Sequence, residues 1–376
     1  METYLDCNAT TALDPSIRRE VLRYMTDEYG NAASRTHAFG LRARDAVRRA
    51  SALVASVAGA NEEDVIFTSG ATESNNLALL GLLPHGERRG LRHIVSTQIE
   101  HGSVLGPLAV AAGRGFEVTL IRPLPGGWVD PDMVRAAVRA DTLAVSVMQV
   151  NNETGIVQPI EAIADRLRQS EAYFHVDAAQ GFGKSVDALR HPRIDLLSVS
   201  GHKLFAPKGV GALIARRRAG ERPPLAPILF GGGQQGGLRP GTLPVPLVVG
   251  LGLAAEAALR DHDVRASACR AFRAHALGAL SPLDPLVHGD PARALPHVLN
   301  LSFPGVDAEA LMMAWRGIIA VSNGAACTSR GHEGSHVLRA MGLDQASIDG
   351  AVRLSWSHRT EEPDWGRVVD AVRRLR

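Results

Sequence analysis

Short apolar segments alternate with longer amphipathic ones over the first two thirds of the chain. The apolar runs have the length of strands, and helical periodicity fills the intervals between them. Strands that are apolar throughout are covered on both faces, so this alternation is typical of an α/β domain with a mostly parallel sheet. The expected strands are 65–68, 93–96, 143–148, 173–176, 196–200 and 212–215, and the clearest helices are 17–28, 72–83 and 160–168.

The pattern changes after about residue 256. A long helix rich in alanine and arginine leads to strand-like segments at 298–302 and 352–355, which predicts a smaller α+β domain. A chain of 376 residues also exceeds the usual size of a single core. We therefore assign residues 12–256 to a large domain, and residues 1–11 and 257–376 to a small one.

The charge of the chain is nearly balanced, with 41 basic and 39 acidic residues and a formal net charge of +2. This balance excludes a surface that coats nucleic acid, and a polybasic membrane anchor. The longest apolar stretch, 247–259, contains Glu256 and is too short to span a bilayer. The start of the chain shows no signal peptide, and Cys7, Cys269 and Cys327 lack the spacing of metal ligands. We expect a cytoplasmic protein without a metal site, membrane segment or direct contact with nucleic acid.

Lysine is rare in this chain, because among the 41 basic residues only Lys184, Lys203 and Lys208 are lysines. A Schiff base requires a primary amine that can lose its proton, whereas arginine stays charged. Lys203 follows the apolar strand 196–200 and is expected to lie desolvated at the sheet edge, as a Schiff-base lysine requires. Lys184 and Lys208 lie in glycine-containing turns and are expected to be loop cations.

Two further segments carry candidate chemistry. In segment 67–76 a strand ends, a turn of small residues follows and a helix opens, so that free N–H groups and the Thr72 and Ser74 hydroxyls can bind a phosphate. Helix capping alone explains the same residues. Asp177 ends the strand 173–176, at the edge where open α/β sheets bind ligands. Its carboxylate suits a pyridinium N–H, and equally a helix cap or a metal.

Cys327 lies in segment 322–334 among small residues and glycines, without an apolar pattern that predicts burial. Neighbouring cations such as Arg330 and His332 favour the thiolate, which is the reactive form of cysteine. A small buried residue at the start of a helix is the alternative interpretation.

In this order, the segments resemble fold-type I pyridoxal-phosphate enzymes of the class V aminotransferase group, and most closely the cysteine desulfurases. The resemblance extends from residue 4 to about residue 360. It implies a large cofactor-binding domain with a mostly parallel sheet, and a smaller α+β domain that carries the cysteine loop. Further segments that carry it are YLDCNATT at 4–11, GNAASRTH at 30–37, IEHGSVL at 99–105 and VNNETG at 150–155.

The resemblance implies roles for single residues. Lys203 forms the Schiff base with pyridoxal 5'-phosphate, Asp177 pairs with the pyridine nitrogen, and His101 stacks on the ring. Arg353 binds the carboxylate of the substrate, with Asn31 as a second substrate contact. The residues implied to hold the phosphate or the ring hydroxyl are Ala71, Thr72, Asn152, Gln180, Ser200, His202 and, in a homodimer, Thr242 of the partner subunit.

The reaction that the resemblance implies begins when L-cysteine displaces Lys203 from the cofactor. Lys203 then takes the α-proton, and His101 moves protons in the later steps. The Cys327 thiolate attacks the sulfur of the substrate, which leaves a persulfide on Cys327 and releases L-alanine. A sulfur-acceptor protein finally collects the sulfur.

The chain departs from the family pattern at a few positions. Ala32 stands where proline is usual, and Gln234, Gln235 and Pro240 replace frequent residues in the partner-facing part of the cofactor site. None of these changes removes a group that the reaction requires.

The segment 327–338 resembles the longer-loop branch of the family. Members of this branch supply sulfur for iron–sulfur clusters, tRNA thiolation or DNA phosphorothioate modification, and general resemblance favours the last. The alternatives are a selenocysteine lyase, another pyridoxal-phosphate lyase or aminotransferase, and a non-catalytic sulfur-relay scaffold. Cys327 argues against enzymes that need no cysteine, and the intact set of catalytic residues argues against the scaffold.

Overall fold

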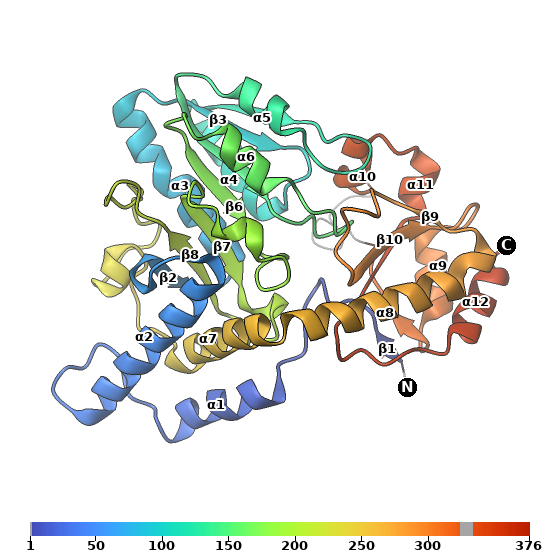
Figure 1. Cartoon of the computed structure of the whole chain (residues 1–376), viewed down its shortest axis with the longest axis horizontal. Coiled ribbons are helices and arrows are strands. Elements are labelled where there is room, and N and C mark those ends of the chain that lie inside the picture. Colours follow the sequence, from blue (N-terminus) through green and yellow to red (C-terminus); the bar gives the residue numbers. More distant parts are fainter. Residues whose placement is uncertain (1, 324–333) are drawn as a thin grey trace.

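The computed structural model describes residues 2–323 and 334–376, and its main body is a layered α/β structure (Figure 1). The strands of the central sheet are β2 (Val65–Thr68), β3 (His93–Thr97), β4 (Glu117–Ile121), β5 (Thr142–Met148), β6 (Tyr173–Asp177), β7 (Leu196–Ser200) and β8 (Gly211–Ala215). Among the described residues they lie in the order β2-β8-β7-β6-β5-β3-β4. Neighbours from β7 to β4 pair in parallel, whereas β8 is antiparallel to both β2 and β7. The predicted fold class, α/β with a mostly parallel sheet, is confirmed.

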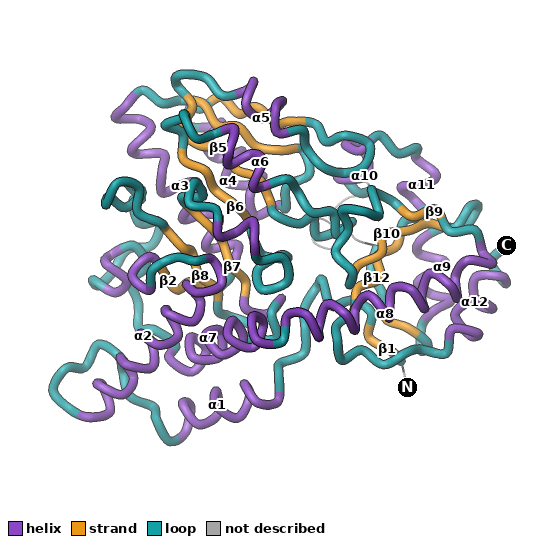
Figure 2. Tube along the Cα trace, in the orientation of Figure 1, coloured by secondary structure: helices purple, strands orange, loops and turns teal. Residues whose placement is uncertain are grey.

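Helices cover both faces of this sheet, as Figure 2 shows. One face is covered by α1 (Pro15–Thr26), α2 (Ala38–Ala58), α5 (Pro131–Ala137), α6 (Ile160–Arg166) and α7 (Val245–Arg260), which share one hydrophobic core with the strands. The other face is covered by α3 (Ala71–Arg89) and α4 (Gly102–Gly113). Strands that are buried between two helical layers have no polar face, which is why they are continuous apolar runs in the sequence.

Strand β4 is the exception, and the apolar pattern does not predict it. It lies at the sheet edge, pairs with β3 and leaves Glu117 and Leu120 exposed. A strand that is partly exposed carries polar residues between its apolar ones, so no continuous run marks it.

A second hydrophobic core lies beside the first. It is built from α8 (His262–Leu280), α9 (Ala308–Trp315) and α12 (Trp365–Arg373) on an antiparallel sheet in the order β12-β10-β9. The strands of this sheet are β9 (Leu286–Val287), β10 (Val298–Ser302) and β12 (Val352–Ser355). Leu5 packs into this core, and β1 (Thr3–Tyr4) pairs in parallel with β11 (Ile319–Ala320). The short helices α10 (His336–Met341) and α11 (Gln345–Asp349) complete the fold, and the boundaries assigned to the two domains stay a prediction.

None of the helices within residues 2–323 and 334–376 combines the length and the apolar character that a membrane crossing requires.

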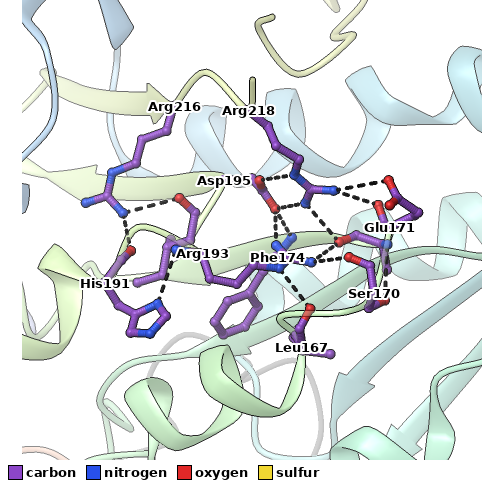
Figure 3. Close-up of polar contacts among 11 residues, drawn as sticks. Leu167, Ser170, Glu171, Phe174, His191, Arg193, Asp195, Arg216 and Arg218 are labelled. Carbon is purple, nitrogen blue, oxygen red and sulfur yellow. Dashed lines mark hydrogen bonds and ion pairs between the residues drawn. The ribbon is translucent and has the colours of Figure 1, made fainter. Parts of the chain in front are cut away.

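A network of partly buried arginines around a buried carboxylate ties three strands together, at the end of the sheet opposite to Asp177 (Figure 3). Asp195 precedes β7 and is 4% exposed. Its Oδ2 accepts hydrogen bonds from the Phe174 N–H at 2.7 Å, from Arg193 Nη1 at 2.6 Å and from Arg218 Nη2 at 2.6 Å. The network therefore fixes the starts of β6 and β7 against the end of β8, and leaves their opposite ends available for a site.

We expect Asp195→Asn to lower the free energy of unfolding by about 3 kcal/mol, because it leaves the Arg193 guanidinium buried without a counter-ion. Urea denaturation at constant cofactor load measures the change. The matched control is Asp132→Asn, which removes an exposed ion pair to Arg166 and should leave the unfolding midpoint nearly unchanged. An equal effect of both substitutions would show that the buried network contributes no more than a surface pair.

Candidate active site

A cavity of about 670 Å³ lies at the carboxyl ends of the central strands. Ligands bind at this edge in open α/β sheets because the loops that leave the strands converge there. The cavity brings together ten of the residues predicted from the sequence. These are Ala71, Thr72, His101, Asn152, Asp177, Gln180, Ser200, His202, Lys203 and Arg353.

Lys203 reaches the cavity from the short 3-10 turn Gly201–Lys203 that follows β7. Its Nζ donates hydrogen bonds to the carbonyl oxygens of Asn8 and Ala9, the latter at 2.8 Å. His202 beside it is half-buried, and desolvation together with the charge of Lys203 lowers the pKa of its imidazole to about 4. The His202 imidazole is therefore neutral at physiological pH and does not place a second positive charge beside the Lys203 amine.

Asp177 ends β6 and is 4% exposed. Its Oδ2 accepts a hydrogen bond from Asn75 Nδ2 at 2.8 Å, and its Oδ1 accepts one from the Ala179 N–H at 2.9 Å. Two neutral donors thus hold the carboxylate in place. Because they leave its negative charge uncompensated, a cationic N–H in the cavity would find a strong acceptor there.

His101 caps the start of α4. Its Nδ1 accepts a hydrogen bond from the Ser103 N–H at 3.0 Å and lies 2.8 Å from Ser103 Oγ. A backbone N–H can only donate, so Nδ1 is an acceptor and the neutral ring carries its proton on Nε2. Asn75 Nδ2 also donates to Ser103 Oγ at 2.9 Å, which links His101 to Asp177 through two buried side chains.

The turn between β2 and α3 forms the wall of the cavity at Ser69, Gly70, Ala71 and Thr72. The Ser69 N–H donates to Glu73 Oε2 at 2.7 Å, and Glu73 in turn pairs with Arg239 at 2.8 Å. These contacts hold the turn in place, so that the first residues of α3, Ala71 and Thr72, stay in the wall of the cavity. A 19-residue helix adds the positive end of its dipole to this wall, which suits an anion.

Arg353 extends from β12 and is 4% exposed. Its Nη1 donates to the Asn152 carbonyl oxygen at 2.9 Å, and its Nη2 pairs with Asp6 Oδ1 at 2.6 Å. Each terminal nitrogen carries a second N–H, so the oriented guanidinium retains donors for a carboxylate.

Three of the described residues that were singled out from the sequence, Asn31, Thr242 and Lys184, do not line this cavity. Asn31 and Thr242 are exposed and line a separate hollow of about 430 Å³. Cys327 lies outside the described residues. Lys184 lies in a turn, as expected, but it is only partly exposed and its ammonium lies 3.4 Å from the buried His297. Lys208 is exposed, as expected.

The sequence did not single out several residues that shape the site. The Asn8 and Ala9 carbonyls act through the backbone, and Asn75 and Ser103 act through the network behind the cavity. Glu100 is fully buried, and burial raises the pKa of its carboxyl to about 8 although Thr97 and the Met148 N–H donate to it. The position of Glu100 directly before His101 was the signal in the sequence that could have pointed to it. Its burial, however, results from contacts with distant segments and could not be predicted.

Comparison with known proteins identifies the family. The model of the class-V aminotransferases matches residues 3–365. The chain is 42% identical to the cysteine desulfurase IscS of Anaeromyxobacter dehalogenans, over 99% of this chain and 93% of that protein. The crystal structure of DndA from Streptomyces lividans is similar with a TM-score of 0.82 at 48% identity, over 94% of this chain and 99% of that one. The structure of a NifS-like protein has a TM-score of 0.90 at 32% identity, over 100% of this chain and 98% of that one. The chain therefore belongs to the class-V aminotransferase family and, within it, to the cysteine desulfurases.

Proposed function

We propose that the cavity of about 670 Å³ at the carboxyl ends of the central strands, which we call the catalytic cavity, binds pyridoxal 5'-phosphate (PLP). In this proposal the protein is a cytoplasmic cysteine desulfurase that transfers the sulfur of L-cysteine to Cys327 and releases L-alanine. The observation that carries the proposal is the convergence of Lys203, the buried carboxylate of Asp177 and the start of α3 on one cavity. An amine, a carboxylate and a helix N-terminus suit the aldehyde, the ring nitrogen and the phosphate of PLP.

Different residues of the cavity would hold different parts of the cofactor. Asp177 would hold the ring nitrogen, and His101 would lie against the ring face. Asn152 and Gln180 would lie near the ring hydroxyl. The phosphate would be held by Ala71, Thr72, Ser200 and His202. When bound, PLP supplies an electron sink for the electrons of the bond that breaks at the α-carbon of an amino acid.

The remaining polar groups orient the substrate and move protons. The Arg353 guanidinium, held by Asp6 and the Asn152 carbonyl, binds the α-carboxylate of L-cysteine. Lys203 Nζ would act as the base that takes the α-proton of the bound L-cysteine. The proton on His101 Nε2 is fixed by the Ser103 N–H on the other ring nitrogen, so His101 is prepared to donate rather than accept at that atom.

The sulfur step balances without an external oxidant or reductant. The Cys327 thiolate attacks the substrate sulfur, the bond between that sulfur and the β-carbon breaks, and a sulfur–sulfur bond forms. The β-carbon takes the electron pair of the broken bond and a proton, so the substrate leaves as L-alanine. A sulfur-acceptor protein then receives the sulfur from the persulfide.

The enzyme acts as a homodimer in which Thr242 of the partner subunit contributes to the phosphate site. The hollow lined by Asn31 and Thr242 supports this arrangement, because both side chains are exposed in one chain and Arg35 and Arg44 give the hollow a positive charge. Asn31 would then contact substrate across the subunit interface.

The sulfur enters DNA phosphorothioate modification. The likeness to DndA, at 48% identity over nearly the whole of that chain, supports this route over iron–sulfur clusters and tRNA thiolation.

We expect Lys203→Ala to lose the covalent link to the cofactor and to lower alanine release by about 10³-fold, because both the amine and the base for the α-proton are gone. Borohydride reduction followed by intact-mass measurement detects the link. Lys208→Ala is the matched control and should keep it, since Lys208 lies exposed at the rim of the cavity. Cofactor fixed to Lys203→Ala at the wild-type level would contradict the assignment.

Cys327→Ser should remain yellow but release neither sulfide nor persulfide sulfur from L-cysteine, because the attacking thiolate is absent. Alanine and sulfide are measured together, with Cys269→Ala as a control that removes a buried thiol instead. Full sulfur release by Cys327→Ser would replace the persulfide reaction with that of a general lyase or a selenocysteine lyase.

Arg353→Lys should raise KM for L-cysteine about 10- to 100-fold, because lysine cannot form the two-pronged contact to a carboxylate. Steady-state alanine release gives KM and kcat, and the absorbance of the cofactor should stay unchanged. Arg359→Lys, at an ion pair with Asp14 outside the cavity, should leave KM as it is. A fall in kcat with unchanged KM would place Arg353 in a different step.

A further inference from the structure

A second cleft, of about 330 Å³, lies between the two hydrophobic cores, and we call it the rear cleft. Its walls come from the N-terminal segment at Cys7 and Thr11, from residues 183–187, from the start of α8 and from residues 295–297 and 356–358. Figure 1 shows α8 running along this junction. A volume of this size is at the lower end of the range of about 300–1,000 Å³ that small-molecule sites occupy.

The rear cleft and the catalytic cavity are lined by neighbouring residues of the same two chain segments. Asn8 and Ala9 line the catalytic cavity, whereas Cys7 and Thr11 on the same segment line the rear cleft. His202 and Lys203 line the former, and Leu204 and Phe205 the latter. The two cavities thus lie back to back, separated by two short segments. None of the residues that the structure describes lines both of them, so the rear cleft is separate from the catalytic cavity.

The rear cleft contains a lysine without an acidic partner. Lys184 Nζ donates a hydrogen bond to His297 Nε2 at 3.4 Å. Burial lowers the pKa of His297 well below its usual value, so that ring is neutral. None of the described residues places a carboxylate within ion-pair distance of Lys184. Burial lowers the pKa of Lys184 to about 8, as expected for an ammonium group whose charge is not compensated.

The neighbouring thiols do not supply the missing negative charge. Cys7 and Cys269 both line the rear cleft, and burial raises the pKa of Cys269 to about 11 and shifts that of Cys7 upward as well. Both are neutral thiols at physiological pH. They leave the cleft lined by a cation and by groups that do not neutralise it.

Most of the remaining lining is basic or apolar, with the hydroxyl groups of Thr11, Ser185 and Ser357 beside it. Arg265 and Arg270 add two guanidinium groups from α8, and Asp187 is the sole acidic side chain among the described lining residues. Arg265 is already oriented by Asp261 at 3.2 Å and stacks over Phe205 at 5.5 Å. The apolar part of the wall is formed by Leu204, Phe205, Leu295 and Trp356. This combination suits a ligand with one anionic end and an apolar body.

We propose that the rear cleft is a second binding site, which takes a small organic carboxylate whose anionic end pairs with Lys184 and whose apolar body packs against Phe205, Leu295 and Trp356. Such a ligand supplies the counter-charge that the protein itself does not provide. It would also contact Thr11, whose Oγ1 donates to the His202 carbonyl oxygen at 3.0 Å, on the segment that carries Lys203.

The test uses the holoenzyme at pH 7 and 2-naphthoate as the probe, followed by isothermal titration calorimetry. Its neutral isostere 2-naphthamide is the matched ligand. We expect 2-naphthoate to bind with one site per chain and about tenfold or more tightly than 2-naphthamide, because the amide cannot neutralise Lys184.

Three variants locate the bound probe. Lys184→Met removes the cation at nearly constant length, and Ala266→Phe fills the cleft without changing its charge; each should weaken binding of 2-naphthoate about tenfold or more. Arg353→Lys alters the carboxylate contact in the catalytic cavity and should leave this binding unchanged. The proposal is overturned if 2-naphthoate does not bind to the wild type, binds equally to Lys184→Met and Ala266→Phe, or loses binding in Arg353→Lys alone.

Discussion

The segment from Leu5 to Thr11 joins the two hydrophobic cores, and the catalytic cavity depends on that connection. Leu5 packs into the second core, and the Cys7 N–H donates to the Ser355 carbonyl oxygen on β12 at 3.0 Å. A few residues later, the Asn8 and Ala9 carbonyls accept hydrogen bonds from Lys203, and the Thr11 N–H donates to the His202 carbonyl oxygen at 2.9 Å. This one segment, which contains a turn at residues 7–9, thus sets the position of Arg353, on the same β12, relative to Lys203 at the end of the central sheet.

The two buried carboxylates at opposite ends of the central strands have different surroundings, and we assign them different roles: Asp195 stabilises the fold, and Asp177 belongs to the catalytic cavity. At one edge, Asp195 and its arginines neutralise one another and hold the strand starts together. At the opposite edge, Asp177 is held by the neutral donors Asn75 and the Ala179 N–H. A carboxylate held in this way keeps its charge available to a bound group, whereas a carboxylate between arginines does not. The two edges of one sheet therefore serve different purposes.

The same principle distinguishes the two cavities on either side of the N-terminal segment. The catalytic cavity contains a carboxylate, an amine and a guanidinium, and its contacts hold each of them in a defined orientation. The rear cleft contains the Lys184 ammonium beside a neutral histidine and two neutral thiols, and its lining also includes Asp187. The first arrangement suits a zwitterionic amino acid and a cofactor with several functional groups. The second suits a ligand with one anionic end and an apolar body.

Most strands, and ten of the residues that line the catalytic cavity, could be predicted from the sequence alone. Strands that are buried along their whole length are mainly apolar, so 65–68, 196–200 and 298–302 coincide with β2, β7 and β10. Asp177 follows such a run and therefore lies where its strand ends. Features that depend on contacts between distant segments could not be predicted from the sequence and are known only from the three-dimensional structure. The antiparallel direction of β8, the partly exposed strand β4, the backbone acceptors of Lys203 and the contact of Lys184 with His297 all arise from such contacts. A local pattern reports whether a residue is apolar or charged, but burial and hydrogen-bond partners are set by residues that are near in space and far apart in the chain.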